Sequence, residues 1–390
     1  MRIRTAIGAA VVIFAIAALP VVHAATWIEL WPLGATDQKW NAVASSADGS
    51  RLIVAVHGGH LYTSENGGIS WTERRPGGDA TRLWFTVASS ADGLRLIAAA
   101  ENGRLYTSAD GGATWTERQP AGDRTLIWAS VAASADGLRL IVAANSGRLY
   151  TSADGGVTWT ERQPAGDQDL DWQAVASSSD GSRLIAAAYY GRLYVSADHG
   201  ATWTERRPAG DTDVPWYTVA SSADGERLIV GAYGGGLYTS SDFGANWTKH
   251  EPAGAGNRVW VAAASNATGS ILAAGVYPGR LYVSTDSAAT WVEEQPAGDT
   301  NQYWRALTSD ASGAKLIAGV YNGRLYTSNQ IAPVTPTPTT GIPDTATPTP
   351  TMTATATATS TPTATPTATA TPTGAPTATP TATATPTAAP

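Results

Sequence analysis

The chain contains no cysteine, and it is poor in histidine, phenylalanine and methionine, with five, three and two residues in 390. Without cysteine it has no disulfide framework, no thiolate metal site and no cysteine nucleophile. Five histidines leave few ligands for a histidine-based metal site. The sequence therefore predicts neither a metal nor a cofactor.

An excess of positive charge is also missing. The chain has 25 basic and 32 acidic residues, which gives a formal net charge of −7. Proteins that bind nucleic acids or anionic membranes present basic surfaces to the phosphates. We therefore expect no nucleic-acid partner.

Residues 1–24 have the pattern of an export signal. Arg2 and Arg4 precede an apolar run over residues 6–22, and Val22-His23-Ala24 places small residues at the positions that a leader peptidase reads. The alternative is an uncleaved anchor, because a run of this length approaches the span of a membrane. Cleavage after Ala24 is favoured and predicts a secreted or extracytoplasmic cell-surface protein.

Residues 331–390 consist almost entirely of Thr, Pro and Ala, with Asp344 as the single charge. Such a segment lacks the apolar surface needed to offset the entropy of folding. We expect a low-complexity stalk or linker. Membrane association is expected only through an uncleaved leader or through a partner beyond this segment, and the chain is expected to be a monomer.

Tryptophan, in contrast, is abundant and periodic. Two series recur every 44 residues. The first comprises Trp40, Trp84, Trp128, Trp172, Trp216, Trp260 and Trp304, and the second comprises Trp27, Trp71, Trp115, Trp159, Trp203, Trp247 and Trp291. A fixed period of this length indicates an array of one supersecondary unit.

Each unit is predicted to be all-β. In the second copy, residues 84–90, 94–100, 104–107 and 115–118 form four short strands that turns separate. Four strands without helical periodicity are typical of a propeller blade. The seventh copy lacks a fourth strand, and residues 25–29 align with 113–117 and supply one. Residues 25–330 are therefore predicted to form a closed seven-bladed β-propeller, since an open array would leave bare sheet edges.

The turn before the fourth strand carries the motif Ser-x-Asp-x-Gly-x-x-Trp. Its aspartates are Asp110, Asp154, Asp198, Asp242 and Asp286, while the first copy has Asn66 and the sixth has Ala288 in place of glycine. A carboxylate there accepts hydrogen bonds from backbone amides across the turn. Carboxylates that recur in this way are interpreted as structural, and so are the Asp-Gly turns at Asp48, Asp92, Asp136, Asp180 and Asp224.

This motif resembles the BNR or Asp-box repeat of the sialidase-like β-propellers, and the resemblance covers residues 25–330. The Ycf48 and HCF136 photosystem II assembly factors are similar seven-bladed propellers. The first likeness implies glycan chemistry, and the second implies binding to a membrane-protein partner.

The turns between the second and third strands share one face with the loops that join the blades. There we predict a ligand-binding arc of Tyr189, Tyr233, Tyr277 and Tyr321 beside a ring of Arg104, Arg148, Arg192, Arg280 and Arg324. Aromatic faces can stack on sugar rings and arginine can bind a carboxylate. The alternative is structural, with arginines paired to Glu117, Glu161 and Glu205 and tryptophans in the core.

An enzyme is the less favoured interpretation. The resemblance to sialidases implies an arginine triad, a Tyr–Glu nucleophile pair and an acid/base Asp, but the Arg-Ile-Pro signature is absent. Glu101 is the weak catalytic candidate, since glycosidases use two carboxylates. We expect a non-catalytic binding or scaffold propeller for a glycan or protein surface. The alternatives are a sialidase-like glycosidase and a Ycf48-like assembly factor.

Overall fold

The computed structural model describes residues 25–101 and 103–329, so the predicted leader and stalk lie outside the described residues. Every regular element in these ranges is a β-strand. No described segment forms an apolar helix with the length needed to cross a membrane. The prediction of an all-β protein built from antiparallel strands is confirmed.

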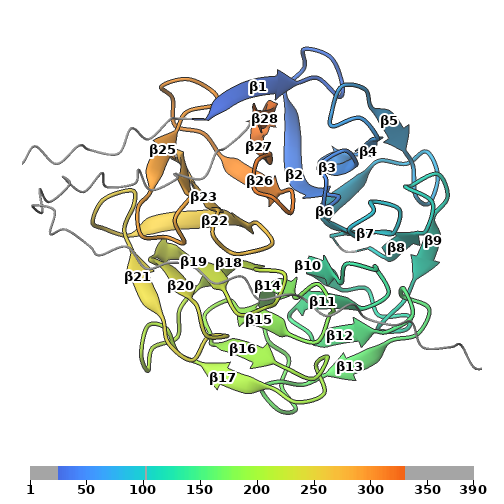
Figure 1. Ribbon diagram of the computed structural model, residues 1–390. Helices are drawn as coiled ribbons and strands as arrows, with labels where there is room; N and C mark the ends of the chain where they lie inside the picture. The colour runs from blue at the N-terminus through green and yellow to red at the C-terminus, as the bar shows by residue number, and fades with distance from the viewer. Residues whose placement is uncertain (1–24, 102, 330–390) are drawn as a thin grey trace, which may run out of the picture. The chain divides into compact units, whose positions relative to one another are not determined.

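A four-strand antiparallel unit recurs along the chain, and its strands succeed one another outward from a central axis (Figure 1). The first, innermost strands are β2 (Gln38–Ser45), β6 (Arg82–Ser89), β10 (Ile127–Ala133), β14 (Trp172–Ser177), β18 (Trp216–Ser221), β22 (Arg258–Ser265) and β26 (Trp304–Ser309). The second strands are β3 (Leu52–Gly59), β7 (Leu96–Ala100), β11 (Leu140–Asn145), β15 (Leu184–Ala188), β19 (Leu228–Gly235), β23 (Leu272–Val276) and β27 (Leu316–Gly323).

The outer two strands of each unit are short. The third strands are β4 (Leu61–Ser64), β8 (Leu105–Ser108), β12 (Leu149–Ser152), β16 (Leu193–Ser196), β20 (Leu237–Ser240), β24 (Leu281–Ser284) and β28 (Leu325–Asn329). The fourth strands are β5 (Thr72–Arg74), β9 (Thr116–Arg118), β13 (Thr160–Arg162), β17 (Thr204–Arg206), β21 (Thr248–His250) and β25 (Val292–Glu294).

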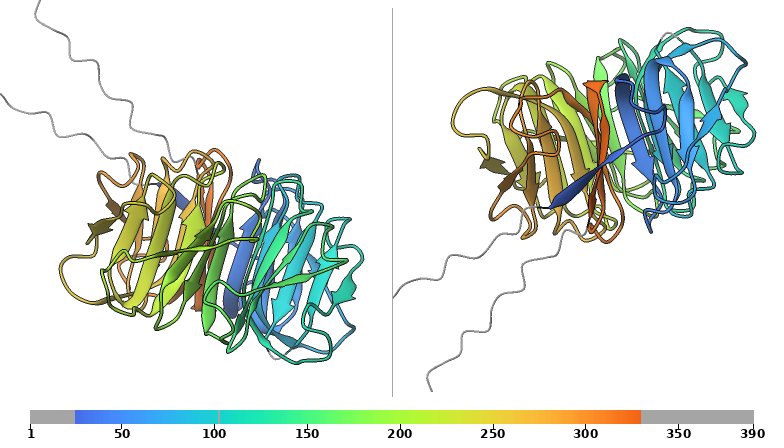
Figure 2. Two further views of the ribbon diagram at one scale, coloured as in Figure 1. Left: turned by 90° about the horizontal axis from the view of Figure 1, so that it is seen from below. Right: turned by 90° about the horizontal axis from the view of Figure 1, so that it is seen from above.

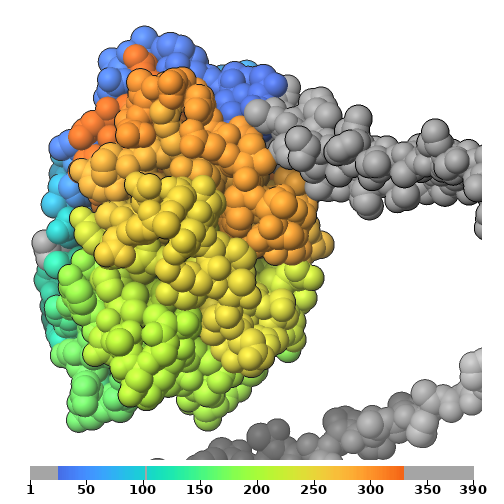
Figure 3. All heavy atoms as spheres, turned by 90° about the vertical axis from the view of Figure 1, so that its left-hand side faces the viewer, coloured from blue at the N-terminus to red at the C-terminus, as the bar shows by residue number. Residues whose placement is uncertain are grey.

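The last unit takes its fourth strand from the other end of the chain. β1 (Thr26–Leu30) pairs antiparallel with β28, with Ile28 opposite Thr327 and Leu30 opposite Leu325. Two views agree on this arrangement. β1 lies beside the orange strands of the last unit in Figure 2, and the blue N-terminal residues lie against the same unit in Figure 3. The sheet of the last unit therefore ends on β1.

Neighbouring units are linked by one repeated backbone hydrogen bond. Ala47 N–H donates to Ala91 O at 2.8 Å, and the same bond recurs from each unit to the next at 2.7–2.9 Å through Ala135, Ser179, Ala223, Ala267 and Ala311. The series ends with Ala311 N–H donating to Ala47 O at 2.9 Å, so its last member bonds to its first.

The inner tryptophans form the contacts between units. Each is buried, with at most 2% of its surface exposed. Trp128 packs edge to face on Tyr150 in its own unit, and its Nε1–H donates to Gly103 O of the preceding unit at 3.0 Å. Trp40 makes the same bond to Gly323 O of the last unit at 3.1 Å. The inner tryptophans are thus core residues, as the structural interpretation predicted.

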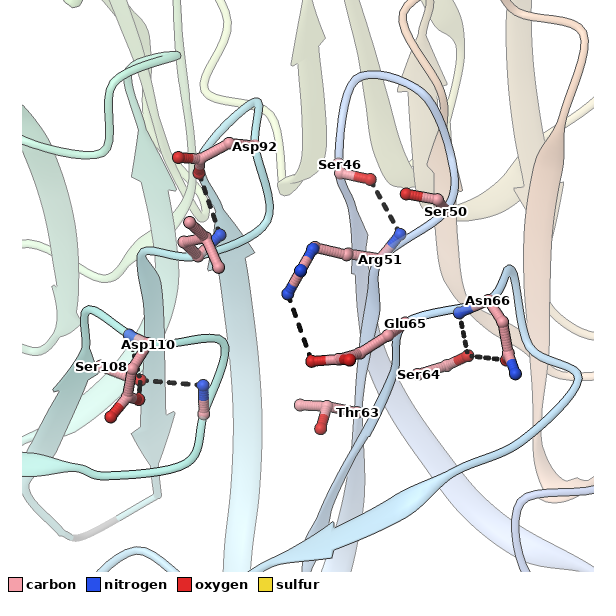
Figure 4. Close-up of polar contacts among 12 residues, drawn as sticks. Ser46, Ser50, Arg51, Thr63, Ser64, Glu65, Asn66, Asp92, Ser108 and Asp110 are labelled. Carbon is pink, nitrogen blue, oxygen red and sulfur yellow. Dashed lines mark hydrogen bonds and ion pairs between the residues drawn. The ribbon is translucent and has the colours of Figure 1, made fainter.

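The Asp-box residues hold their turns together. Asp110 lies against Ser108 in its turn (Figure 4), and its carboxylate accepts a hydrogen bond from Ser108 Oγ at 2.7 Å. The same carboxylate accepts a second hydrogen bond from Thr114 N at 2.9 Å. In the first copy, Asn66 Oδ1 accepts the equivalent bond from Ser70 N. Gly112 has a φ of +88°, and Ala288, which replaces the equivalent glycine, has a φ of +71°. The turn is therefore retained even where a side chain must adopt the left-handed region.

These hydrogen bonds predict acid sensitivity. In the Asp boxes they lower the pKa of Asp110, Asp154, Asp198 and Asp242 to about 2. Hydrogen bonds from neighbouring serines do the same for Asp48 and Asp180 in the Asp-Gly turns. A carboxyl whose folded-state pKa is depressed stabilises the fold above its unfolded pKa, and this contribution is lost as the pH falls. We expect the denaturant midpoint to be constant near pH 5–6 and to fall between about pH 4 and pH 2. A midpoint that stays constant down to pH 2 would contradict this assignment.

Candidate functional site

The inner strands surround a central channel with a volume of about 200 Å³. The three residues that follow each inner tryptophan line it. The first of these three differs in every unit, and the set is Asn41, Phe85, Ala129, Gln173, Tyr217, Val261 and Arg305. The third is valine in five of the seven units. A repetitive scaffold thus carries a ring of positions that differ in every unit, and recognition residues are expected at such variable positions.

A β-bulge in each first strand explains why these side chains are not paired within the sheet. The register between the first and second strands shifts directly after each inner tryptophan, so Asn41 and its equivalents have no partner residue in the second strand. Bulges re-aim a side chain without ending the strand. These positions were not predicted from the sequence, because the predicted site residues were chosen for their recurrence from unit to unit. The signal was available in the sequence, because the position after the inner tryptophan takes seven different identities.

Arg305 is a member of this ring, and its guanidinium faces four aromatic side chains. Its guanidinium carbon is 5.1 Å from the ring centroid of Phe85, 5.9 Å from that of Tyr217, and 5.8 Å from those of Tyr303 and Tyr321. These four rings come from three different units, and distances below about 6 Å are those of cation–π contacts. Arg305 thus reaches across the channel instead of contacting its own unit alone.

The charge of Arg305 has no acidic partner. One of its terminal N–H groups donates to the Tyr303 hydroxyl at 2.8 Å. No carboxylate forms an ion pair with it among residues 25–101 and 103–329. A guanidinium has five donors in a planar fork that fits a carboxylate. The site therefore offers a cation with free donors, framed by aromatic rings.

All four predicted tyrosines lie in two aromatic arms that meet at Arg305. In the first arm Tyr189 contacts Tyr190, Tyr217 and Tyr233, with centroids 4.6, 6.4 and 6.4 Å away. The second arm stacks Tyr277 on Tyr303 at 3.7 Å, and Tyr303 contacts Tyr321 at 5.3 Å. Tyr190 and Tyr233 are 67% and 39% exposed, so the first arm remains open to solvent. Their role as ligand contacts stays a prediction.

Two phenols of this site, those of Tyr189 and Tyr217, have raised pKa values. Burial and the neighbouring phenols raise the pKa of Tyr189 to about 12. Burial also raises the pKa of Tyr217, while the Arg305 guanidinium acts in the opposite direction. Protonated tyrosines are hydrogen-bond donors and stacking surfaces. They are poor nucleophiles, because a nucleophilic tyrosine needs a base or a lowered pKa.

The five predicted arginines lie at the rim and are engaged within the chain. Arg104, Arg148 and Arg280 each donate to the carbonyl of a glycine in the following loop at 3.0 Å, and Arg192 donates to Gly210 O at 3.2 Å. Their carboxylate partners include Glu117, Asp169, Asp213, Glu293 and, for Arg324, Asp37. The geometry favours their structural interpretation, with the difference that Arg148 pairs with Asp167 and Asp169 and not with Glu161.

Glu101, the weak catalytic candidate, faces a histidine. Its Oε2 lies 3.3 Å from His57 Nε2, and His57 Nδ1 lies 3.3 Å from the Tyr321 hydroxyl. Glu101, His57 and Tyr321 thus form a row of three polar contacts, and Tyr321 belongs to the second arm. The described residues contain no group of three or more acidic or histidine side chains arranged to hold a metal ion.

One protein-family model matches a short part of the chain. Residues 237–250 match the family model described as the BNR-Asp box repeat. A search of curated protein sequences gives no match. This match and the all-β fold support the resemblance to the BNR or Asp-box repeat that the sequence motif indicated.

Solved structures are similar in fold at low identity. A structure described as YCF48 bound to D1 peptide has a TM-score of 0.63 and 15% identity, and covers 80% of this chain and 100% of that one. YCF48 from Cyanidioschyzon merolae has a TM-score of 0.60 and 16% identity, with coverages of 78% and 99%. The GH74 xyloglucanase from Xanthomonas campestris has a TM-score of 0.59 and 17% identity, with coverages of 78% and 54%.

The contact between Arg305 and Tyr217 can be tested without a ligand. Because the guanidinium lowers the pKa of Tyr217 against the effect of burial, Arg305→Met should raise that pKa further. The 13Cζ resonance of Tyr217, assigned with Tyr217→Phe, would report the titration. Arg124→Met is the matched control, because Arg124 is an exposed arginine that pairs with Asp169. An unchanged Tyr217 titration in Arg305→Met would contradict the contact.

Proposed function

We propose that the protein is an exported, non-catalytic binding propeller that holds a carboxylate-bearing glycan at the mouth of its channel. The proposal includes a closed ring of seven blades, because the two aromatic arms and Phe85 converge on Arg305 only if the units surround one axis. The inter-unit hydrogen bond from Ala311 to Ala47 and the pairing of β1 with β28 support that closure.

The observation that carries the proposal is the unpaired guanidinium of Arg305 between aromatic faces. A carboxylate would meet free N–H donors there, and the rings of Tyr217 and Tyr321 would offer surfaces for the C–H edges of a pyranose. Asn41 adds a polar group, since its buried Oδ1 accepts no hydrogen bond in the described structure. These groups fit an acidic sugar better than a neutral one.

Absence of catalysis is proposed on the chemistry of the groups at the mouth. Tyr189 and Tyr217 have raised pKa values, and Glu101 is paired with His57 instead of facing a second carboxylate. Glycoside hydrolysis usually needs two carboxyl groups placed across the scissile bond. The fold likeness to a xyloglucanase keeps a glycosidase as the alternative, and its test is the loss of any turnover in Glu101→Gln.

A peptide ligand is the second candidate. A propeller of similar fold is known with a bound D1 peptide, and a peptide also carries carboxylates that Arg305 could bind. The Thr/Pro segment and the export signal favour a cell-surface role over an assembly role. An acidic peptide set belongs in the same binding experiment, so that the two ligand classes are compared directly.

We expect a glycan array to show binding of uronic- or sialic-acid glycans by the full chain, without hydrolysis of fluorogenic glycosides. Arg305→Leu removes a charge-assisted interaction of about 1.5–3 kcal/mol and should weaken binding roughly 10- to 100-fold. Tyr233→Ala should weaken it less, because this change removes a ring that contacts Tyr217 and leaves the charge of Arg305 in place. Arg124→Leu is the control and should bind as the wild type does.

The outcomes separate the candidates. Equal binding of neutral and acidic glycans, or full affinity in Arg305→Leu, would contradict the proposed site. Binding confined to the acidic peptides would replace the glycan with a peptide at the same site. Turnover that Glu101→Gln abolishes would establish an enzyme.

A further inference from the structure

Glu294 breaks the pattern of the fourth strands. In five of these strands the last residue is basic, and the set is Arg74, Arg118, Arg162, Arg206 and His250. Arg118 Nε, for example, donates to Thr107 Oγ1 of its own unit at 2.8 Å. β25 instead ends in Glu294, and the residue equivalent to Thr107 is Val283. The acid therefore has no hydroxyl partner at that place in its own unit.

Glu294 bonds to the beginning of β1 instead. Its Oε1 accepts a hydrogen bond from Ala25 N at 3.1 Å, and its Oε2 accepts one from Trp27 Nε1 at 2.9 Å. Five other tryptophans of this series donate to a glycine of their own Asp box, as Trp115 does to Gly112 O, while Trp291 Nε1 has no partner among the described residues. Trp27 has no Asp box before it in the sequence. Glu294 therefore takes over the acceptor role at the strand that completes the last unit.

The carboxyl group is buried without a cation. Glu294 is 4% exposed, and no ion pair involves it among the described residues. Burial raises its pKa. A buried carboxylate without a positive partner is costly, and such groups are normally paired. The described structure thus holds an acid that lacks its counter-charge, next to the main-chain nitrogen of Ala25.

We propose that Glu294 is the counter-ion of a new N-terminus at Ala25, produced when the leader is removed. Hydrolysis of the Ala24–Ala25 bond by a leader peptidase consumes one water. It leaves a carboxylate on Ala24 of the released leader and an α-ammonium on Ala25. The nitrogen that donates to Glu294 in the described structure then carries a positive charge. An ion pair forms at the start of β1 in the processed chain alone.

Two independent observations point to the Ala24–Ala25 bond. The leader pattern places cleavage after Ala24 from residue size alone, with no reference to Glu294. In the structure, the Glu294 carboxylate accepts hydrogen bonds from the nitrogen of Ala25, which directly precedes β1, and from the indole of Trp27. Processing thereby anchors the strand that pairs with β28. In the unprocessed chain the same contact is an ordinary hydrogen bond from an amide.

The test compares two N-termini in the exported chain. One protein begins at Ala25 and the other carries Gly-Ser before Ala25; both continue to residue 390. Each is made as wild type, as Glu294→Gln and as Glu293→Gln. Glu293 is the matched control, because it is the adjacent acid and its partners are Tyr282, Gln295 and Arg280.

We expect the free N-terminus to raise the melting temperature by roughly 2–4 °C over the extended chain. The difference should disappear in Glu294→Gln, which keeps a carbonyl acceptor for Trp27, and should persist in Glu293→Gln. At neutral pH the α-amine of Ala25 should react with an amine-acylating ester about tenfold more slowly in wild type than in Glu294→Gln, since pairing keeps the amine protonated.

Three results would overturn the proposal. N-terminal sequencing of the exported protein could give a first residue other than Ala25. The two N-termini could melt at the same temperature in the wild type, or their difference could remain in Glu294→Gln. None of these results bears on Arg305, so failure here is distinguishable from failure of the proposed ligand site.

Discussion

The backbone hydrogen bond between neighbouring units is the interaction on which the rest of the structure depends. It runs from Ala47 to Ala91 and onward until Ala311 donates to Ala47. Each bond fixes the end of one inner strand against the next. The buried inner tryptophans fix the other end by packing between units, and Trp40, Trp128 and Trp304 also donate to a glycine carbonyl of the preceding unit. Because both ends are fixed, the residue that follows each tryptophan is held at one level of the channel. The site at Arg305 is a consequence of that constraint.

Scaffold positions keep the same residue from unit to unit, whereas the positions of the candidate site change. Asp110, Ser108 and their equivalents keep one identity, because each turn needs the same acceptors. The bulged positions vary freely, since their side chains point away from the sheet and into the channel. A repetitive scaffold can in this way carry one asymmetric centre, in which a single arginine faces aromatic rings from several units.

Much of the fold could be predicted from the sequence, and the reasons are physical. The 44-residue period, the strand lengths and the structural role of Asp110 follow from local turn chemistry and hydrophobic pattern, and the structure has them. The site was predicted in part. Tyr189 and Tyr321 were predicted as ligand contacts because they lie next to a turn whose place in a blade is known, and that role stays a prediction. Arg305 and Tyr217 were missed, because their convergence depends on contacts between units far apart in the chain, which no local pattern reveals.

The arginines of the turns show the same limit. Considered alone, Arg148 has the chemistry of a ligand contact. In the structure it pairs with Asp167 and Asp169, which come from a loop whose path the sequence does not define. Glu294 is the converse case. Its departure from the basic pattern is visible in the sequence, and its meaning appears only when β1 is placed beside it.

Closure of the ring by β1 is the claim that the account depends on most, and the absence of cysteine allows a direct measurement. Ile28 and Thr327 are register partners across β1 and β28, and directly opposed residues in antiparallel strands have Cβ atoms about 4.5–5.5 Å apart. The double variant Ile28→Cys, Thr327→Cys should form one intramolecular disulfide under mild oxidation, with no free thiol left in the monomer. Thiols that stay reactive, or disulfides that join separate chains, would contradict closure.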